Sequence, residues 1–344
     1  MGKRGAGKAA FLGLRDIAAQ AGVSHMTVSR VISRPESVAE PTRRRVQEAI
    51  EKLGYVPNLA ARDLVRGSSS FVGMVVSSIQ NVFFAATVEG LVRGLEPLGL
   101  QVMLGDAEFS AAREASLVRG FIARRAAAVV LMGTDHDPEV VRLLARSRLP
   151  VVETWDLTAR PIRACVGFDN VAVGAIAARH FAAIGARRAV VLGRSTPRNR
   201  KRIAGFLAEA ERLGLPPARH LELADGNALR IGRAAFAKLW ETSPAERPDA
   251  LFFVSDTLAI GAVLEAGRRG VAVPAEVAIL GFGDHPLAAE LVPSLSTIAA
   301  PLEEMGREAA ALIARALSGE DIRGQVRDLG IMLIARDSTN RGRP

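Results

Sequence analysis

From Phe71 onward, short runs of apolar residues alternate with stretches in which apolar positions recur at helical spacing. Eight runs predict buried β-strands, namely FVGMVVSSI, LQVMLGD, AAAVVLMG, LPVVETWD, ACVGFD, RAVVLG, ALFFVSD and VAILGF. Amphipathic helices are predicted between them, over 83–98, 110–123, 171–184, 202–213, 230–240 and 257–268. This alternation is typical of parallel sheets covered on both faces. Residues 71–335 are therefore expected to form an α/β core of two doubly wound parallel-sheet halves, with a ligand cleft between them.

The pattern before residue 57 contains only helical spacing. Residues 14–21 have apolar positions on one side, and Gly22 then suits a tight turn with positive φ. Ser24 offers a hydroxyl to cap a second helix. A third helix is predicted over 42–53, with Thr42 as its cap and Gly54 as its end. Three short helices with a glycine turn between the first two predict a helix-turn-helix domain.

The second helix divides into two faces. Val28, Val31 and Ile32 share one arc, and Thr27 lies at its edge. The opposite arc carries the side chains suited to a DNA groove, which are His25, Met26, Ser29 and Arg30. An arginine can donate two bonds to a guanine, a histidine can bond a base edge or a phosphate, and a methionine can contact a thymine methyl. Ser24 and Thr27 are better placed for phosphates; the alternative is an ordinary amphipathic surface helix.

Charge is concentrated at the same end of the chain. The net charge is +9 over 344 residues, and residues 1–67 hold 12 Lys and Arg against 6 Asp and Glu. This basic end favours an acidic polymer as its partner, the alternative being a solvated basic tail.

Other classes of protein find little support in the chain. The single cysteine, Cys165, leaves no internal disulfide and no cysteine cluster for zinc. The start of the sequence lacks the apolar segment of a secretory signal, and no long uncharged apolar run is present. Phosphate-binding loops and the motifs of nucleophilic or metal-dependent hydrolases are also absent. We therefore expect a cytoplasmic, nucleoid-associated protein that is no enzyme and has neither a cofactor nor a metal.

The stretch LRDIAAQAGVSHMTVSRVISRPESVAEPTRRRVQEAIEKLGYVPNLAARDL resembles the DNA-binding segment of the LacI/GalR family of bacterial repressors, without a gap. The resemblance implies that Tyr55, Asn58, Ala61 and Leu64 also contact DNA. In the family, the segment matching 58–67 folds into a hinge helix on the operator, and Leu64 matches the leucine that enters the minor groove. The alternative is a linker leucine that packs on the core. The expected parts are a basic extension (1–13), the helix-turn-helix domain (14–57), a hinge and linker (58–70), the core (71–335) and a tail (336–344).

The core resembles the periplasmic sugar-binding-protein fold throughout 71–335. The resemblance implies that an effector lies in the cleft between the halves. Arg202 matches the arginine that grips effector hydroxyls or carboxylates, and the other residues assigned to this site are Asn81, Phe83, Phe84, Ser255, Asp256 and Asp284. Asp169 has two interpretations, a structural one and a ligand-binding one. Trp155 is expected either to pack against the carbon face of the effector or to be buried between the halves.

Two departures from the family pattern bear on the effector. Ser255–Asp256 stands where neutral-sugar members usually have Asn–Asp, and Gly283 stands where they usually have an aspartate. A carboxylate suits a neutral polyol but repels an anion at close range. The absence of a carboxylate at Gly283, beside the cationic PRNRKR segment, favours a sugar acid clamped by arginine. Arg198 and Arg200 are further candidates for effector contacts, the alternative being solvated side chains.

Within the family, VVETWD, AVVLG, VGFDN and the late DLG most resemble the gluconate-operon repressors. The expected function is therefore a homodimeric repressor that binds a palindromic operator and leaves it when gluconate or a related aldonate binds the core. Alternatives are a neutral-sugar effector, a corepressor, or a solute-binding receptor without a DNA role. The tail lacks leucine heptads, so no coiled-coil tetramer is expected.

Overall fold

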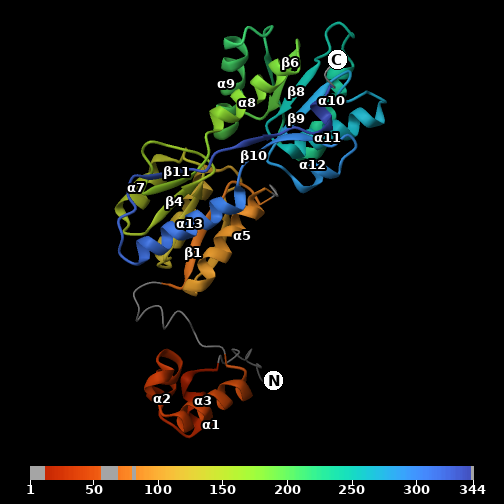
Figure 1. Ribbon diagram of the computed structural model, residues 1–344. Coiled ribbons are helices and arrows are strands. Elements are labelled where there is room, and N and C mark those ends of the chain that lie inside the picture. Colours follow the sequence, from red (N-terminus) through yellow and green to blue (C-terminus); the bar gives the residue numbers. More distant parts are fainter. Residues whose placement is uncertain (1–11, 56–68, 80–82, 342–344) are drawn as a thin grey trace, which may run out of the picture. The chain divides into compact units, whose positions relative to one another are not determined.

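The computed structural model describes residues 12–55, 69–79 and 83–341. The chain divides into two compact units, and the boundary falls between Ser70 and Phe71 (Figure 1).

The first unit is a small three-helix domain. It consists of α1 (Leu14–Ala21), α2 (His25–Ser33), the short 3₁₀ helix η1 (Pro35–Ser37) and α3 (Glu40–Leu53). Ile17, Val28 and Val46, one from each α-helix, are fully buried at its centre. Gly22 and Gly54 end α1 and α3 in the left-handed conformation, at φ 63° and 61°, which glycine adopts without strain. The predicted turn and the predicted end of the third helix are therefore confirmed.

The predicted start of the third helix is wrong. The helix begins at Glu40, its N-cap residue is Ala39, and Thr42 lies inside its first turn. Pro41 occupies that first turn, where its missing N–H costs nothing because those groups have no partner within the helix. The apolar stripe used for the prediction starts only at Val46, so it could not reveal the polar first turn.

The second unit contains two six-stranded sheets. In the first sheet every strand pair is parallel, and the order is β11 (Gln325–Asp328), β5 (Ala164–Gly167), β4 (Val151–Thr154), β3 (Ala128–Met132), β1 (Phe71–Val76) and β2 (Gln101–Asp106). The order in the second sheet is β12 (Met332–Ile334), β10 (Ser296–Ala299), β9 (Ala278–Phe282), β8 (Ala250–Phe253), β6 (Ala189–Gly193) and β7 (Arg219–Glu222). Among the strands of the described residues, only β12, at an edge, runs antiparallel to its neighbour. The predicted fold class is confirmed.

Helices cover both sheets. Those of the first half are α5 (Phe84–Leu95), α6 (Ala111–Ala123), α7 (Pro138–Arg146) and α13 (Leu302–Leu317). Those of the second half are α8 (Asn170–Ala183), α9 (Pro197–Arg212), α10 (Ala228–Trp240), α11 (Asp256–Arg268) and α12 (Pro286–Glu290). Two short 3₁₀ helices complete the described core, η2 (Glu96–Leu98) after α5 and η3 (Asp337–Thr339) near the end of the chain. Helix α13, late in the chain, packs beside the early α5 (Figure 1). The chain therefore returns from the second half to the first before it ends.

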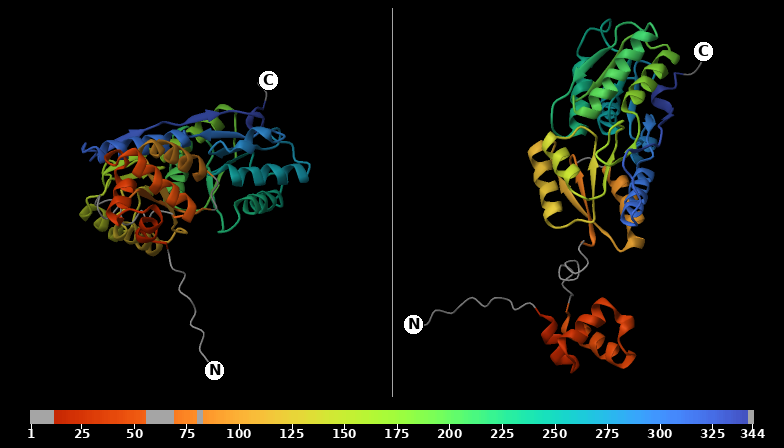
Figure 2. Two further views of the ribbon diagram at one scale, coloured as in Figure 1. Left: turned by 90° about the horizontal axis from the view of Figure 1, so that it is seen from below. Right: turned by 90° about the vertical axis from the view of Figure 1, so that its left-hand side faces the viewer.

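The C-terminal part of the chain joins both halves. Strand β11 completes the first sheet and β12 the second, so the chain crosses between them once more (Figure 2). Residues 336–339, expected as part of a tail, pack on the second half instead. Ser338 is fully buried, and its hydroxyl donates to the carbonyl oxygen of Ile279 at 2.6 Å. The core extends to this segment because its small polar side chains satisfy buried backbone groups, which hydrophobic periodicity does not reveal.

All eight predicted strands are present, and so are the six predicted core helices. The pattern missed β7, β10, β11 and β12, as well as α7, α12 and α13, and it started α9 five residues late. Three of the missed strands lie at sheet edges and are only partly buried. Of these, β7 and β11 mix polar and apolar residues and so lack a continuous apolar run, whereas β12 is apolar but only three residues long. The first turn of α9, PRNRK, is polar, so the apolar pattern did not reveal it.

Candidate functional site

The polar face of α2 is exposed as the sequence predicted. Val28 and Val31 are buried against α1 and α3, whereas His25, Met26, Ser29 and Arg30 are exposed. Met26 is 59% exposed, which is unusual for a large apolar side chain that serves only packing. The geometry leaves these four side chains available to a groove.

The start of α2 is fixed by its own hydroxyl groups. The Ser24 hydroxyl accepts a hydrogen bond from the Thr27 amide at 3.1 Å and lies 2.9 Å from the Thr27 hydroxyl. The predicted cap is therefore confirmed. Tyr55 is half-buried against the small apolar core of this domain. Asn58, Ala61 and Leu64 lie outside the described residues.

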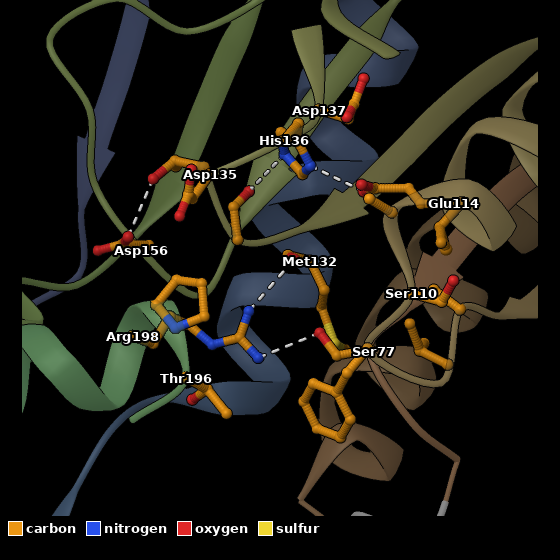
Figure 3. Close-up of a pocket in the computed structure, with 18 of the residues that line it drawn as sticks. Ser77, Ser110, Glu114, Met132, Asp135, His136, Asp137, Asp156, Thr196 and Arg198 are labelled. Carbon is orange, nitrogen blue, oxygen red and sulfur yellow. Dashed lines mark hydrogen bonds and ion pairs between the residues drawn. The ribbon is translucent and has the colours of Figure 1, made fainter. Parts of the chain in front are cut away.

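The core holds a cleft made of two adjoining cavities, of about 380 and 820 Å³. Residues from both halves line it, and four residues border both cavities: Phe109, Arg194, Thr196 and Arg198. The smaller cavity, drawn in Figure 3, lies beside the ends of β1, β3 and β4. The larger cavity includes Phe83, Phe84, Trp155, Arg202 and Ser255 of the predicted effector site. Asn81, also predicted for this site, lies outside the described residues.

Helix α9 presents two arginines to this cleft. Arg198 and Arg202 are four positions apart, so they lie on the same face of the helix. Gly174 of α8 and Gly205 of α9 let the two helices approach closely, because a Cβ at Gly174 would lie 1.9 Å from the carbonyl oxygen of Arg202. The polar first turn of α9 is therefore a wall of the cleft, and a close helix crossing sets its position.

Arg202 is buried, with 5% of its surface exposed, and three contacts fix its position. Its Nε donates to the Asn170 side-chain oxygen at 2.8 Å and its Nη1 to the Val254 carbonyl oxygen at 2.9 Å. The guanidinium also stacks 3.8 Å above the Phe282 ring. Burial, together with the charge of Arg198, lowers the pKa of Arg202 to about 9, so it stays cationic near neutral pH.

Arg198 reaches from the second half to the first. Its guanidinium donates to the Met132 carbonyl oxygen and to the Ser77 hydroxyl, each at 3.2 Å (Figure 3). Burial lowers its pKa to about 10. Arg200, two positions away, lines neither cavity; its side chain is 58% exposed and lies 3.6 Å from Asp135. The two arginines that the sequence left as equal candidates therefore differ in environment.

Three aromatic side chains form an apolar wall of the larger cavity. The Phe84 ring packs edge-on against Trp155, with 4.9 Å between ring centroids, and the Phe83 ring packs edge-on against His285. Trp155 is buried, and its indole N–H donates to the Thr87 hydroxyl at 3.1 Å. Both interpretations of Trp155 thus have a structural counterpart, since it is buried and also borders the cavity.

The predicted aspartates lie elsewhere. Asp256 is fully buried, lines neither cavity, and accepts hydrogen bonds from the His285 amide and the Thr297 hydroxyl, each at 2.7 Å. Asp284 also lines neither cavity and pairs with Arg336 at 2.8 Å. Asp169 caps α8 by accepting from the amides of residues 171 and 172, as its structural interpretation expected. These carboxylates stabilise the second half.

Gly283 adopts φ 125°, and a Cβ there would lie 2.4 Å from the Phe83 ring. An aspartate at this position would therefore be both strained and blocked. The ring of Phe83 lies where a carboxylate side chain would start.

Two clusters at the cleft were missed from the sequence. Asp156, at the end of β4, binds Thr134 and Lys201, and His136 lies between Glu114 and Glu153. Residues 134–137 directly follow the buried run AAAVVLMG, so their place at a strand end was the available signal.

The side chain of His136 is buried between two carboxylates. Its Nδ1 lies 2.7 Å from Glu114 Oε1, its Nε2 lies 3.0 Å from the Gly133 carbonyl oxygen, and Glu153 Oε1 is 3.6 Å away. Burial lowers the pKa of His136, but the hydrogen bond and charge of Glu114, the charge of Glu153 and the hydrogen bond to Gly133 together raise it above its ordinary value. Burial raises the pKa of Glu153 to about 7. This cluster ties the 133–137 loop to α6 and β4.

Comparison with known proteins identifies the class. Residues 13–58 match the model of bacterial regulatory proteins of the lacI family, and residues 178–339 match a periplasmic binding protein-like domain. The chain is similar to the HTH-type transcriptional regulator GntR of Pseudomonas aeruginosa, with 36% identity over 95% of both chains.

Solved structures of transcriptional regulators are also similar to this chain. A LacI-family transcriptional regulator from Silicibacter pomeroyi has a TM-score of 0.88 and 30% identity, covering 95% of this chain and 99% of its own. The transcription regulator GntR from Chromobacterium violaceum has a TM-score of 0.71 and 30% identity, covering 78% and 99%.

A helix-turn-helix domain joined to a two-sheet binding core defines a DNA-binding transcriptional regulator with a ligand-binding domain. The chain belongs to the LacI family of bacterial regulatory proteins. No helix within 12–55, 69–79 and 83–341 is long and apolar enough to cross a membrane.

Proposed function

We propose that this regulator is a homodimeric repressor of sugar-acid utilisation genes whose effector is gluconate or a related aldonate. The observation that carries the proposal is the pair of guanidinium groups on one wall of the cleft, of buried Arg202 and partly buried Arg198. Two like charges in a low-dielectric site repel each other, and an anionic ligand relieves that repulsion. Arginine also binds a carboxylate through two parallel hydrogen bonds.

The carboxylates of the larger cavity do not offset these two charges. Glu108 pairs with Arg113, Asp225 pairs with Arg194, and the side chain of Asp106 accepts backbone amides.

The carboxylates of the smaller cavity are also bonded to other groups, although the charge of Asp156 acts on both arginines from beyond ion-pair distance. There Glu114 pairs with His136, Asp135 with Arg200 and Asp156 with Lys201, and the remaining two carboxylates are also bonded: Asp137 caps α7 and Glu222 binds Ser195. Within the described ranges, neither Arg198 nor Arg202 has a carboxylate within ion-pair distance. The cleft therefore favours an anion.

Titration of the full-length protein with gluconate and with neutral hexoses tests the effector. Calorimetry is expected to show gluconate binding that Arg198→Met weakens at least tenfold. Arg212→Met is the matched control, since it removes the same charge from the far end of the same helix, where neither Arg212 nor its partner Glu209 lines a cavity, and it should bind as the wild type does. Binding of neutral sugars alone would contradict the proposal.

The DNA side of the proposal concerns a palindromic operator. A dimer would place two α2 helices in successive major grooves, and effector closure of the cleft would shift the balance toward release. A mobility-shift assay with promoter DNA is expected to show a complex that gluconate dissolves. A complex that forms only with the ligand present would instead identify a corepressor.

A further inference from the structure

Asp156 stands out among the carboxylates of the cleft. It lies just beyond β4, is 2% exposed, and lines the smaller cavity (Figure 3). Its Oδ2 accepts hydrogen bonds from Lys201 Nζ at 2.5 Å and from the Thr134 hydroxyl at 2.9 Å, and its Oδ1 accepts from the Asn170 amide at 3.0 Å. Each oxygen therefore already has a donor, and one donor carries a full positive charge.

The side-chain amide of Asn170 connects Asp156 to Arg202. Asn170 accepts the hydrogen bond of Arg202 Nε at 2.8 Å, so a polar chain runs from Lys201 through Asp156 and Asn170 to Arg202. Lys201 lines neither cavity, and its side chain is 39% exposed. It therefore acts on the cleft through Asp156.

We infer that Lys201 is a specificity-determining residue that neutralises Asp156 so that the cleft accepts an anionic ligand. The inference rests on the proposed function. Without Lys201, the buried Asp156 carboxylate would lose the ion pair that neutralises it and would feel only the charges of Arg198 and Arg202 from beyond ion-pair distance. It would then repel a ligand carboxylate more strongly and attract hydroxyl groups. The cleft would then favour a neutral polyol.

A second role must be separated from this one. Lys201 belongs to the second half of the core and Asp156 to the first, so their ion pair also joins the two halves. If joining the halves were its only role, loss of Lys201 would weaken every ligand equally. A change in selectivity between a charged and a neutral ligand distinguishes the two roles.

The experiment is calorimetric titration of the full-length protein with gluconate and with glucitol, its neutral counterpart. Lys201→Met keeps the length of the side chain and removes its charge. It is expected to weaken gluconate binding ten- to hundredfold, about 1.4–2.8 kcal/mol, while glucitol binding stays or improves. Lys201→Arg should keep wild-type selectivity. The double variant Lys201→Met/Asp156→Asn should recover gluconate binding, because the unpaired carboxylate is gone.

The controls and outcomes separate the hypotheses. A thermal melt checks the fold of each variant, and Lys201→Gln repeats the test should the methionine variant not fold. Unchanged gluconate binding, an equal loss of both ligands, or no recovery in the double variant would each overturn the inference alone. A wild-type protein that does not bind gluconate would overturn the proposed effector and the inference together, and the wild-type titration shows this before any variant is made.

Discussion

The crossing of α8 and α9 gives a sharp prediction, because it sets the position of Arg202. The Cβ of Gly174→Ala would lie 1.9 Å from the carbonyl oxygen of Arg202 and 2.4 Å from the amide nitrogen of Phe206. A carbon atom and an oxygen atom in contact normally lie about 3.3 Å or more apart. Helix α9 must therefore retreat by roughly 1.4 Å, by the same contact distance.

A shift of this size is large compared with the change in length that the hydrogen bonds of Arg202 can tolerate. Hydrogen bonds of 2.8 and 2.9 Å would lengthen beyond useful distance. Loss of a hydrogen bond to a charged group costs about 1.5–3 kcal/mol, and overpacking about 1–3 kcal/mol. We expect Gly174→Ala to lower the free energy of unfolding of the core by about 2–4 kcal/mol, from these two costs partly relieved by relaxation. Gluconate affinity should fall at least tenfold.

Denaturant unfolding and calorimetry of the full-length protein measure both effects. Gly267→Ala on α11 is the matched control, because its Cβ would meet nothing within 4 Å. It should stabilise the core by up to about 1 kcal/mol through helix propensity. Operator binding without effector should survive in both variants, because the helix-turn-helix domain is a separate compact unit. Wild-type stability and gluconate affinity in Gly174→Ala would refute the reasoning.

Three further predictions concern DNA recognition and pH. Arg30→Ala should weaken specific operator binding by about 1–3 kcal/mol, the value of a bidentate guanine contact, in a mobility-shift assay; an equal loss on random DNA would point to a phosphate contact instead. Exchange of His25 and Met26 should change operator preference in a binding-site selection while the melting temperature stays the same, and unchanged preference would make the pair scaffold. Because burial raises the pKa of Glu153 to about 7, the folded protein keeps a proton that the unfolded chain loses above pH 4.5, so stability should fall as pH rises from 4.5 to 7. Glu153→Gln should flatten that fall in unfolding curves recorded across this pH range, and an unchanged slope would assign it to other groups.

Local patterns revealed the three helices of the first unit, apart from the start of α3, and the eight strands and six helices named for the core. The faces of α2 follow from helical periodicity, because packing apolar side chains on one side leaves the other side polar. Gly22 and Gly54 were recognisable because left-handed turns favour glycine. Buried parallel strands were recognisable as apolar runs, whereas the edge strands β7 and β11, which mix polar and apolar residues, were not.

The candidate effector site was predicted only in part. Arg202 and the aromatic residues border the cleft, but Asp256 and Asp284 bind neighbouring groups of the second half. A strand-end position does not reveal which way a carboxylate points or which donors surround it. Long-range contacts make that choice, such as the bond between Asp256 and Thr297, 41 residues apart.

The sequence by itself determined the class of this protein, because a polar helix face, a glycine turn and alternating strands and helices depend on local spacing. The tertiary structure decided the charge of the cleft. Whether a buried carboxylate repels a ligand depends on its partner, and the partner of Asp156 is Lys201, 45 residues away in the other half of the core. Composition counts both charges, but only the fold places them in contact.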